Sequence, residues 1–346
     1  MSIIVLKLPE VKVIADRPRK CPRCKGEILQ RWGGQIRQIR DHRVKEVAVY
    51  RYRCTRCRHT FRHYPAGVDQ AQQSQRLRTL AALCWVLGLS YRGIAAVFDV
   101  FGVGISRMSA WRDAQEEAGK LKRQRMWKPV RVLGLDGAYV LGWGEKRAVM
   151  VAVDLGEGKP VAIGYVDEHN PDAIRRWLEP LVKRLGVSVI VTDDLAQYKT
   201  VAEKLNLEHQ ICQFHVRRWV GQTLHDLQAT LQPEWQWVLQ KITELLEQLP
   251  PDGGKQLFEL WKQIPERRAG RDQPRSPVEQ LRDLLIRMSE HWPYYRVFDW
   301  QKDVPWTNNG SEQVIGRMKI RSRTVRGYKT KSGMLAGLML AGSGVG

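Results

Sequence analysis

Two Cys-x-x-Cys pairs near the start of the chain set the strictest limit on how this sequence can fold. They are Cys21-Pro-Arg-Cys24 and Cys54-Thr-Arg-Cys57. Each pair places two thiolates on one side of a turn, and two such turns can complete a closed tetrahedral Zn²⁺ site. The segment between them has a Gly-Gly turn and then alternates as VAVYRYRC, which is typical of a β-strand. Residues 17–65 therefore predict a zinc ribbon, in which structural Zn²⁺ supplies folding energy that so small a unit cannot gain from apolar burial.

The other cysteines and the nearby histidines leave alternatives open. A pair of redox dithiols is the weaker interpretation of the four cysteines, because the two pairs flank a basic, β-rich segment. His59 and His63 follow the second pair and could replace a cysteine as ligands, although phosphate contact or plain surface exposure is favoured. Cys84 lies in the apolar stretch LAALCWVLGL and is predicted to be an inert core thiol.

The positive charge of the chain lies mainly at its two ends. The formal net charge is +21 over 346 residues. Residues 1–63 contain 17 Lys and Arg against 5 Asp and Glu, and residues 313–346 contain 7 basic residues and no acid. Such clusters favour a polyanionic partner, most often nucleic acid, over evenly solvated surface charge. No apolar run is long enough for a membrane span and the N-terminus lacks a signal-peptide layout, so we expect a cytoplasmic, nucleoid-associated protein without membrane contact.

Residues 69–127 are predicted to form a helix-turn-helix DNA-binding region. Three helical segments are separated by short turns that contain glycine, and Ser90 and Ser106 stand where the second and third should begin. A helix, a short turn and a second helix that opens with Ser-Arg fit this motif, so Arg107 and Arg112 are expected to face DNA. Helical hairpins occur in many proteins, and the adjacent basic ribbon is what favours this interpretation.

The rest of the chain predicts an α/β core with a helical interruption. Residues 128–220 read as three strands, a helix, a strand, a helix, a strand and a helix, which is the order of a ribonuclease-H-like mixed sheet with helices on both faces. Residues 221–300 follow a 3.6-residue apolar period and predict an all-α insertion or an independent helical domain. Residues 301–346 then complete the core. With the ribbon over residues 1–68, the fold class is multidomain α/β.

Three carboxylates that are distant in sequence are predicted to meet in this core. Asp136 lies within the apolar strand VRVLGLDGAYV, where an unpaired carboxylate would be costly. Asp193 ends the strand SVIVTDD, and Glu312 opens the last basic helix. Strand ends are the usual place for ligand sites in α/β sheets. Carboxylates converging from two strands and a helix suit Mg²⁺, or Mn²⁺, in phosphoryl displacement.

Two of these acids also have a purely structural interpretation. Asp136 is followed by glycine and could belong to a turn. Glu312 could simply favour the positive N-terminus of a helix that is capped by Asn309 or Ser311.

The choice between neighbouring acids is a separate question. Asp194 could replace Asp193 as the ligand, but Asp193 comes first off the strand and is preferred, with Asp194 in a supporting role. Asp154 also ends a strand-like run, yet a Gly-x-Gly turn follows so closely that turn capping is favoured.

Cys212 and His215 stand three residues apart where the last strand of this core runs into a helix. Both side chains can point to one side. A zinc site would need two further ligands, and only His209 is nearby, so packing and phosphate positioning are favoured over metal binding.

The glutamate helix carries a basic surface that could hold the DNA backbone. Its basic residues are Arg317, Lys319, Arg321 and Arg323. Asn308 and Asn309 precede Glu312 and could cap the helix or hydrogen-bond a nucleotide.

The chain resembles the DDE transposases of prokaryotic insertion sequences, of the kind with a zinc ribbon, a helix-turn-helix and a helical insertion before the glutamate. The matching stretches are LGLDGAYV, VIVTDDLAQY, ICQFHVRR and WTNNGSEQVIGRMKIR, in that order. The resemblance implies that Asp136, Asp193 and Glu312 are the catalytic, metal-binding triad. It also implies that Cys212 and His215 are a supporting element.

The resemblance further implies an activity on double-stranded DNA. A transposase would hydrolyse a phosphodiester at the element end and join the resulting 3′-hydroxyl to target DNA. The ribbon and the helix-turn-helix would recognise the terminal repeats, and a homodimer or larger assembly would hold two ends. The alternatives are a ribonuclease-H-like nuclease or resolvase without strand transfer, and a non-catalytic DNA-binding regulator derived from a transposase. The presence of all three acids argues against the regulator.

Overall fold

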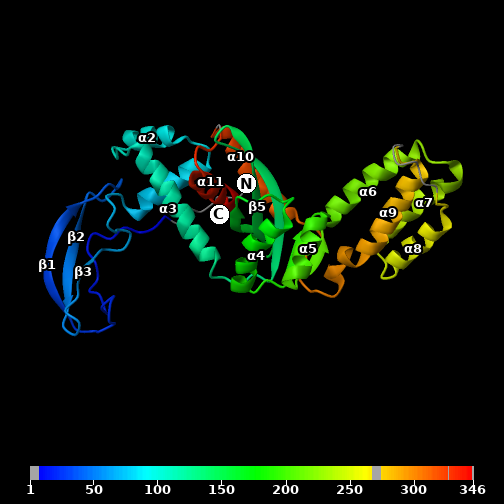
Figure 1. Ribbon diagram of the computed structural model, residues 1–346. Coiled ribbons are helices and arrows are strands. Elements are labelled where there is room, and N and C mark those ends of the chain that lie inside the picture. Colours follow the sequence, from blue (N-terminus) through cyan, green and yellow to red (C-terminus); the bar gives the residue numbers. More distant parts are fainter. Residues whose placement is uncertain (1–7, 267–273, 326, 345–346) are drawn as a thin grey trace. The chain divides into compact units, whose positions relative to one another are not determined.

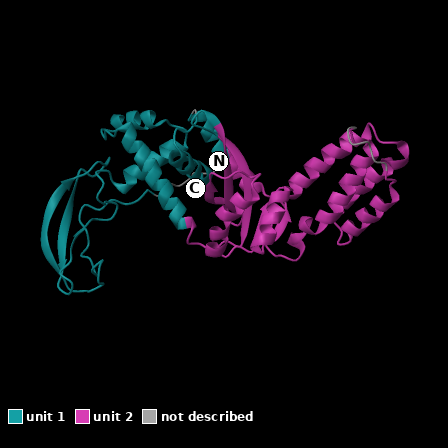
Figure 2. Ribbon diagram, in the orientation of Figure 1, with its two compact units in different colours: residues 1–124, 141–145, 317–346 teal, residues 125–140, 146–316 magenta. Residues whose placement is uncertain are grey.

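In the computed structural model, the strands form two separate sheets, one in each of two units of the chain (Figures 1 and 2). Unit 1 comprises residues 1–124, 141–145 and 317–346, and unit 2 comprises residues 125–140 and 146–316. The structure describes residues 8–266, 274–325 and 327–344. Residues 1–7 lie outside these ranges; they belong to the N-terminal stretch for which the sequence predicts no signal peptide.

The sheet of unit 1 is a three-stranded antiparallel ribbon. Its strands are β1 (Leu29–Gln38), β2 (Glu46–Cys54) and β3 (Thr60–His63), in the order β1-β2-β3. The register shifts between Arg31 and Gly34, where Gly33 has a φ of 115°, a backbone conformation that costs glycine little. One face of β2 packs on a small apolar cluster that includes Val47 and Val49.

Helices complete unit 1, and serine caps begin two of them. They are α1 (Gln75–Val86), α2 (Tyr91–Val100), α3 (Arg107–Arg125) and α11 (Lys331–Ser343). Ser74 Oγ accepts the Leu77 amide, and Ser90 Oγ accepts the Gly93 amide at 3.0 Å, so the predicted cap at Ser90 is confirmed. Cys84 is half-buried in α1, and burial raises the pKa of its thiol.

The sheet of unit 2 is mixed, with strand order β6-β5-β4-β7-β8. The strands are β4 (Val132–Gly142), β5 (Glu145–Asp154), β6 (Lys159–Gly164), β7 (Val189–Thr192) and β8 (Glu208–Ile211). They alternate with α4 (Pro171–Leu185), α5 (Ala196–Leu205) and α6 (Gln213–Gln228) in the predicted order. β6 is antiparallel to β5, whereas β4, β7 and β8 are parallel. The prediction of a multidomain α/β protein is therefore confirmed.

Side-chain alternation gives the two faces of this sheet different cores. Leu133, Leu135 and Ile190 belong to a cluster with α4 and α5. Val132 and Val191 belong instead to a second cluster, together with residues that follow the helical block. The two faces are therefore buried by different parts of the chain.

A helical block follows α6, and its helices are labelled in Figure 1. They are α7 (Gln236–Gln248), α8 (Gly253–Gln263) and α9 (Pro277–His291), with short 3₁₀ turns at Pro233–Trp235, Trp292–Tyr295 and Val297–Asp299. One apolar cluster joins them to α6. The chain ends with α10 (Asn309–Thr324) and α11. The five predicted domain ranges stay predictions. None of the helices formed by the described residues has both the length and the apolarity to span a bilayer.

Candidate functional site

The parallel pairing of β4 with β7 brings two of the predicted acids side by side. Val132 pairs with Val189, and Gly134 pairs with Val191. When this register is continued by two residues, Asp136 stands beside Asp193. Both acids also share a sheet face with Val132 and Val191, because successive side chains in a strand point to opposite faces. The sequence could propose this meeting only from the positions of the acids in apolar strands.

Burial and like charges act on both carboxyls. The pKa of Asp136 is raised to about 7, first by burial and then by the negative charges of Asp193, Glu168 and Glu312. The pKa of Asp193 is raised to about 6, first by burial and then by Glu168 and Asp194. Asp193 Oδ1 is buried without a hydrogen-bond partner. A cation at this position would relieve both the repulsion and the unmet acceptor.

Asp194 has a different environment from Asp193, although the two are adjacent. Its side chain is 5% exposed and accepts from Arg287 Nη2 and His291 Nδ1, each at 2.8 Å. Both partners lie on α9. The carboxylate of Asp194 therefore attaches the helical block to the end of β7, which leaves Asp193 as the better candidate for a metal ligand.

The first turn of α10 packs directly on β4. A Cβ atom on Gly134 would lie 2.4 Å from both Asn308 Oδ1 and Ser311 Oγ, so only glycine permits this approach. Asn308 Nδ2 also donates to the Leu135 carbonyl at 2.9 Å. These contacts bring Glu312 close enough to Asp136 to raise its pKa. Among the described residues, however, the oxygens of Asp136, Asp193 and Glu312 do not all lie within 4.8 Å of one another.

The predicted caps of α10 need a correction. The helix begins at Asn309, and the carbonyl of the preceding residue, Asn308, accepts the amides of Ser311 and Glu312. Ser311 lies inside the first turn, and its buried hydroxyl has no hydrogen-bond partner. It is therefore not the cap.

Glu312 is grouped instead with Cys212 and His215. One ligand atom from each of the three lies within 4.8 Å of the other two. His209, the other ligand that the sequence offered, is buried, and its Nε2 contacts Thr192 Oγ1 at 2.8 Å.

The four ribbon cysteines form the second such group among the described residues. Their sulfur atoms all lie within 4.8 Å of one another, with Cys21 Sγ 3.7 Å from Cys57 Sγ and Cys24 Sγ 3.6 Å from Cys54 Sγ. Four thiols this close match the donor set of a structural zinc site.

Comparison with known proteins decides the family. The model described as "Transposase IS66 family" matches residues 161–336, which is just over half of the chain. The chain belongs to the IS66 family of transposases. The match includes Asp193, Cys212, His215 and Glu312, while Asp136 and the four ribbon cysteines precede it.

The other comparisons add little. A search of curated proteins gave no match for this IS66-family transposase. A solved structure titled "Drosophila P element transposase strand transfer complex" is similar with a TM-score of 0.36 and 11% sequence identity, covering 76% of this chain and 91% of that chain. A TM-score this low carries no weight for the site.

Glu168 is a fourth acid at the site that the sequence did not single out. It follows β6, and a Cβ atom on Gly137 would lie 1.7 Å from its Oε2. Its side chain is 17% exposed, and its charge raises the pKa of both Asp136 and Asp193. The glycine directly after Asp136 was the one available signal, because it leaves room for a neighbour above β4.

Some of the DNA contacts predicted on α3 and α10 of this transposase are exposed, whereas others are hydrogen-bonded to the protein itself. The exposed ones are Arg107, Arg112, Asn309, Lys319 and Arg323. Arg317 donates to the Gly342 carbonyl at 2.7 Å. Arg321 is 4% exposed, donates to the Gly88 and Leu89 carbonyls, and lies over the Trp85 ring.

Two predicted DNA contacts are therefore corrected. Arg321 is a packing residue, and Asn308, at 1% exposure, binds the backbone of β4 rather than a nucleotide.

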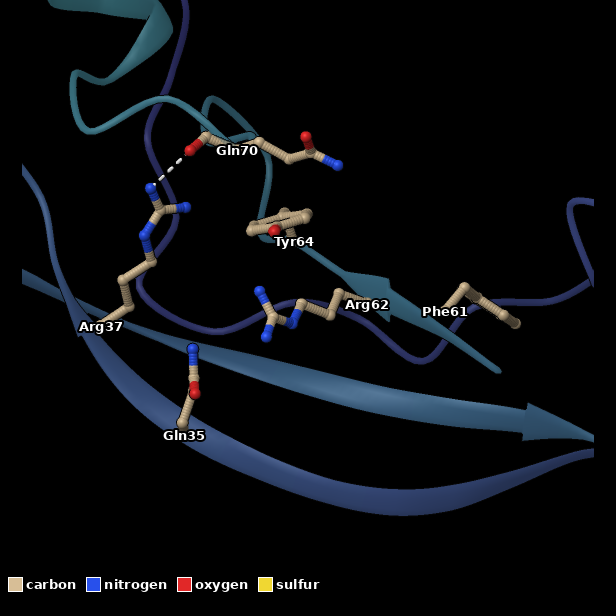
Figure 3. A pocket seen from close by; sticks show the side chains of 6 residues that line it. All are labelled: Gln35, Arg37, Phe61, Arg62, Tyr64 and Gln70. Atoms are coloured by element: carbon tan, nitrogen blue, oxygen red, sulfur yellow. Dashed lines mark hydrogen bonds between the residues drawn. The ribbon is translucent and has the colours of Figure 1, made fainter. Parts of the chain in front are cut away.

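A polar pocket lies on the ribbon of unit 1 (Figure 3). Its lining residues are Gln35, Arg37, Phe61, Arg62, Tyr64 and Gln70. Arg37 donates to the carbonyls of Asp69, Gln70 and Ala71, so its guanidinium fixes the loop beside the pocket. Arg62 is exposed and supplies a second guanidinium in the same pocket.

Proposed function

We propose that this chain is a DNA transposase that binds the ends of its element and catalyses metal-dependent phosphodiester hydrolysis and strand transfer. Membership of the IS66 family supports the class of activity. The observation that carries the proposal is the register of β4 and β7, which sets Asp136 beside Asp193 on the face where α10 begins. The strand order β6-β5-β4-β7-β8 supports a ribonuclease-H-like core that the block α7–α9 interrupts.

Asp136, Asp193 and Glu312 would hold Mg²⁺, or Mn²⁺, with Glu168 as a fourth acid beside them. The donor set fits, because all are hard oxygen ligands and Asp193 Oδ1 and Glu312 Oε1 are buried without partners. Bound divalent ions would supply activation of the attacking oxygen and charge stabilisation at the leaving one.

The reaction itself is two successive displacements at phosphorus. In hydrolysis, the water oxygen bonds to phosphorus and the 3′-oxygen leaves with a proton as a hydroxyl. In strand transfer, that 3′-hydroxyl attacks a target phosphodiester and releases the target 3′-oxygen. The protein contributes by fixing the carboxylates at the strand ends, while Asp194 fixes the end of β7 to α9.

Unit 1 would bind the terminal repeats. Helices α1 to α3 would form the helix-turn-helix, with Arg107 and Arg112 exposed near the start of α3. The ribbon, with Zn²⁺ on its four cysteines, would present Arg62 in its pocket to a backbone phosphate. Two chains would hold two DNA ends.

The test is a Mg²⁺-dependent cleavage and strand-transfer assay on element-end DNA. We expect Asp136→Asn, Asp193→Asn and Glu312→Gln each to abolish both steps. Asp154→Asn is the matched control, since Asp154 also ends a strand but accepts the Gly156 amide at 2.9 Å in a turn, as predicted. Cleavage without strand transfer by the wild type would support the nuclease alternative. Full activity of any triad variant would contradict the proposal.

A further inference from the structure

Three metal-ligating side chains meet where α6 and α10 begin. Cys212 directly precedes α6, His215 lies in the first turn of α6, and Glu312 lies in the first turn of α10. One ligand atom of each residue lies within 4.8 Å of the other two, and His215 Nε2 lies 3.6 Å from Glu312 Oε1. α6 begins directly after β8, and α10 begins against β4. These strands lie on either side of β7, so one sheet holds the three groups together.

Several polar atoms of this group lack protein partners. His215 Nδ1 and Glu312 Oε1 are buried and accept or donate no hydrogen bond. Cys212 is fully buried, and its Sγ accepts the Asn308 amide at 3.1 Å. A buried polar atom without a hydrogen-bond partner destabilises the fold, so a ligand at this position would remove an existing cost.

We propose that Cys212, His215 and Glu312 bind one Zn²⁺ ion, with the fourth coordination position open to water. A thiolate, an imidazole and a carboxylate form a donor set that selects zinc, whereas Mg²⁺ prefers oxygen ligands only. The side chains of His215 and Glu312 are 30% and 36% exposed, which gives an ion a path to the buried sulfur. The sequence had offered only two of the three ligands, because Glu312 lies far along the chain.

Zinc at this position would also affect catalysis, a consequence that depends on the proposed function. Glu312 cannot hold Zn²⁺ beside Cys212 and complete the Mg²⁺ set beside Asp136 with the same oxygen. Zn²⁺ would therefore inhibit Mg²⁺-dependent cleavage by withdrawing Glu312 from the aspartates.

The binding test is the zinc content of the full chain after equilibration with a small excess of Zn²⁺ and desalting. We expect Cys212→Ser to contain one zinc ion fewer per chain than the wild type, whatever the ribbon holds. Cys84→Ser is the matched control, since it removes another cysteine thiol outside both groups and should leave the content unchanged. Equal zinc in wild type and Cys212→Ser would overturn the proposal, as would an equal loss in Cys84→Ser.

Because the Cys212 variant could lose zinc by misfolding, substitutions of the two partly exposed ligands provide a second test. Glu312→Gln and His215→Gln should each lower the content by the same single ion, with an unchanged circular dichroism spectrum. Retention of the full zinc content in both would also overturn the proposal.

The catalytic consequence is measured separately, as zinc inhibition of cleavage. His215→Gln should raise the inhibitory Zn²⁺ concentration at least about 10-fold, because even an outer-shell partner is worth 10–100-fold in metal affinity. Unchanged inhibition would refute the competition. If neither wild type nor variant cleaves DNA, the proposed function fails while the zinc count still decides the site.

Discussion

Replacing Asp136 with asparagine should stabilise the metal-free protein while removing its response to Mg²⁺. The pKa of Asp136 is raised from its usual 3.8 to about 7, mainly by burial. The folded state therefore binds a proton more tightly than the unfolded chain. That contribution is fully present below about pH 4 and is lost as the pH rises through about 7.

The size of the effect follows from the same shift. One pKa unit corresponds to about 1.36 kcal/mol, so the ionised carboxylate costs up to about 4 kcal/mol above pH 7. Asp193 and Glu168 contribute to the same repulsion, so their own cost also changes when Asp136 loses its charge. We therefore expect Asp136→Asn to increase the free energy of unfolding by about 2–4 kcal/mol at pH 8. For a unit of this size, that raises the unfolding temperature by roughly 5–15 °C.

Thermal unfolding of the full chain, followed by calorimetry in Mg²⁺-free buffer, measures this gain. The unfolding temperature of the variant should be higher than that of the wild type at pH 8 and close to it at pH 4. Saturating Mg²⁺ should raise the unfolding temperature of the wild type but not that of Asp136→Asn, because a ligand stabilises the state that binds it. Asp154→Asn should behave as wild type throughout. A variant that is less stable than wild type at pH 8, or one that still responds to Mg²⁺, would refute the reasoning.

Three further substitutions test particular contacts. Asp194→Asn should lower the stability of the fold by about 1–3 kcal/mol, because it removes the ion pair to Arg287 and weakens the hydrogen bond to His291, yet it should leave metal binding intact; thermal unfolding and Mn²⁺ titration measure the two effects. Gly134→Ala should cost about 1–3 kcal/mol and reduce cleavage by displacing α10, whereas Gly221→Ala, with nothing within 4 Å of its added Cβ, should be neutral or slightly stabilising in the same assays. Arg112→Ala should weaken binding to DNA ends and reduce the salt dependence by about one phosphate contact in a filter-binding series, and an unchanged slope would place this residue away from DNA.

The sequence predicted the sheet of unit 2 well because its signals are local. Apolar runs separated by short turns identified the five strands, and an acid inside or directly after such a run marked Asp136 and Asp193. The start of α4 is determined just as locally, since Asn170 Oδ1 accepts the Ala173 amide at 3.0 Å. Each of these follows from a few consecutive residues.

What the sequence missed depends on contacts between distant segments. The partners of Asp194 lie on α9, more than ninety residues away, so its contacts with the helical block could not be predicted from a local pattern. Arg321 was predicted to be a surface cation, but its guanidinium donates hydrogen bonds to the two carbonyls that follow α1. The position of Glu168 over Gly137 likewise depends on a loop whose path only the fold defines.

The central claim, that three distant acids share divalent ions, is tested most directly by Mn²⁺ binding, with unbound Mn²⁺ measured by electron paramagnetic resonance. We predict that Asp136→Asn, Asp193→Asn and Glu312→Gln each weaken Mn²⁺ binding at least about 10-fold, while Asp154→Asn binds as the wild type does. Unchanged Mn²⁺ affinity in Glu312→Gln, with losses in both aspartate variants, would contradict the account by removing Glu312 from the metal site.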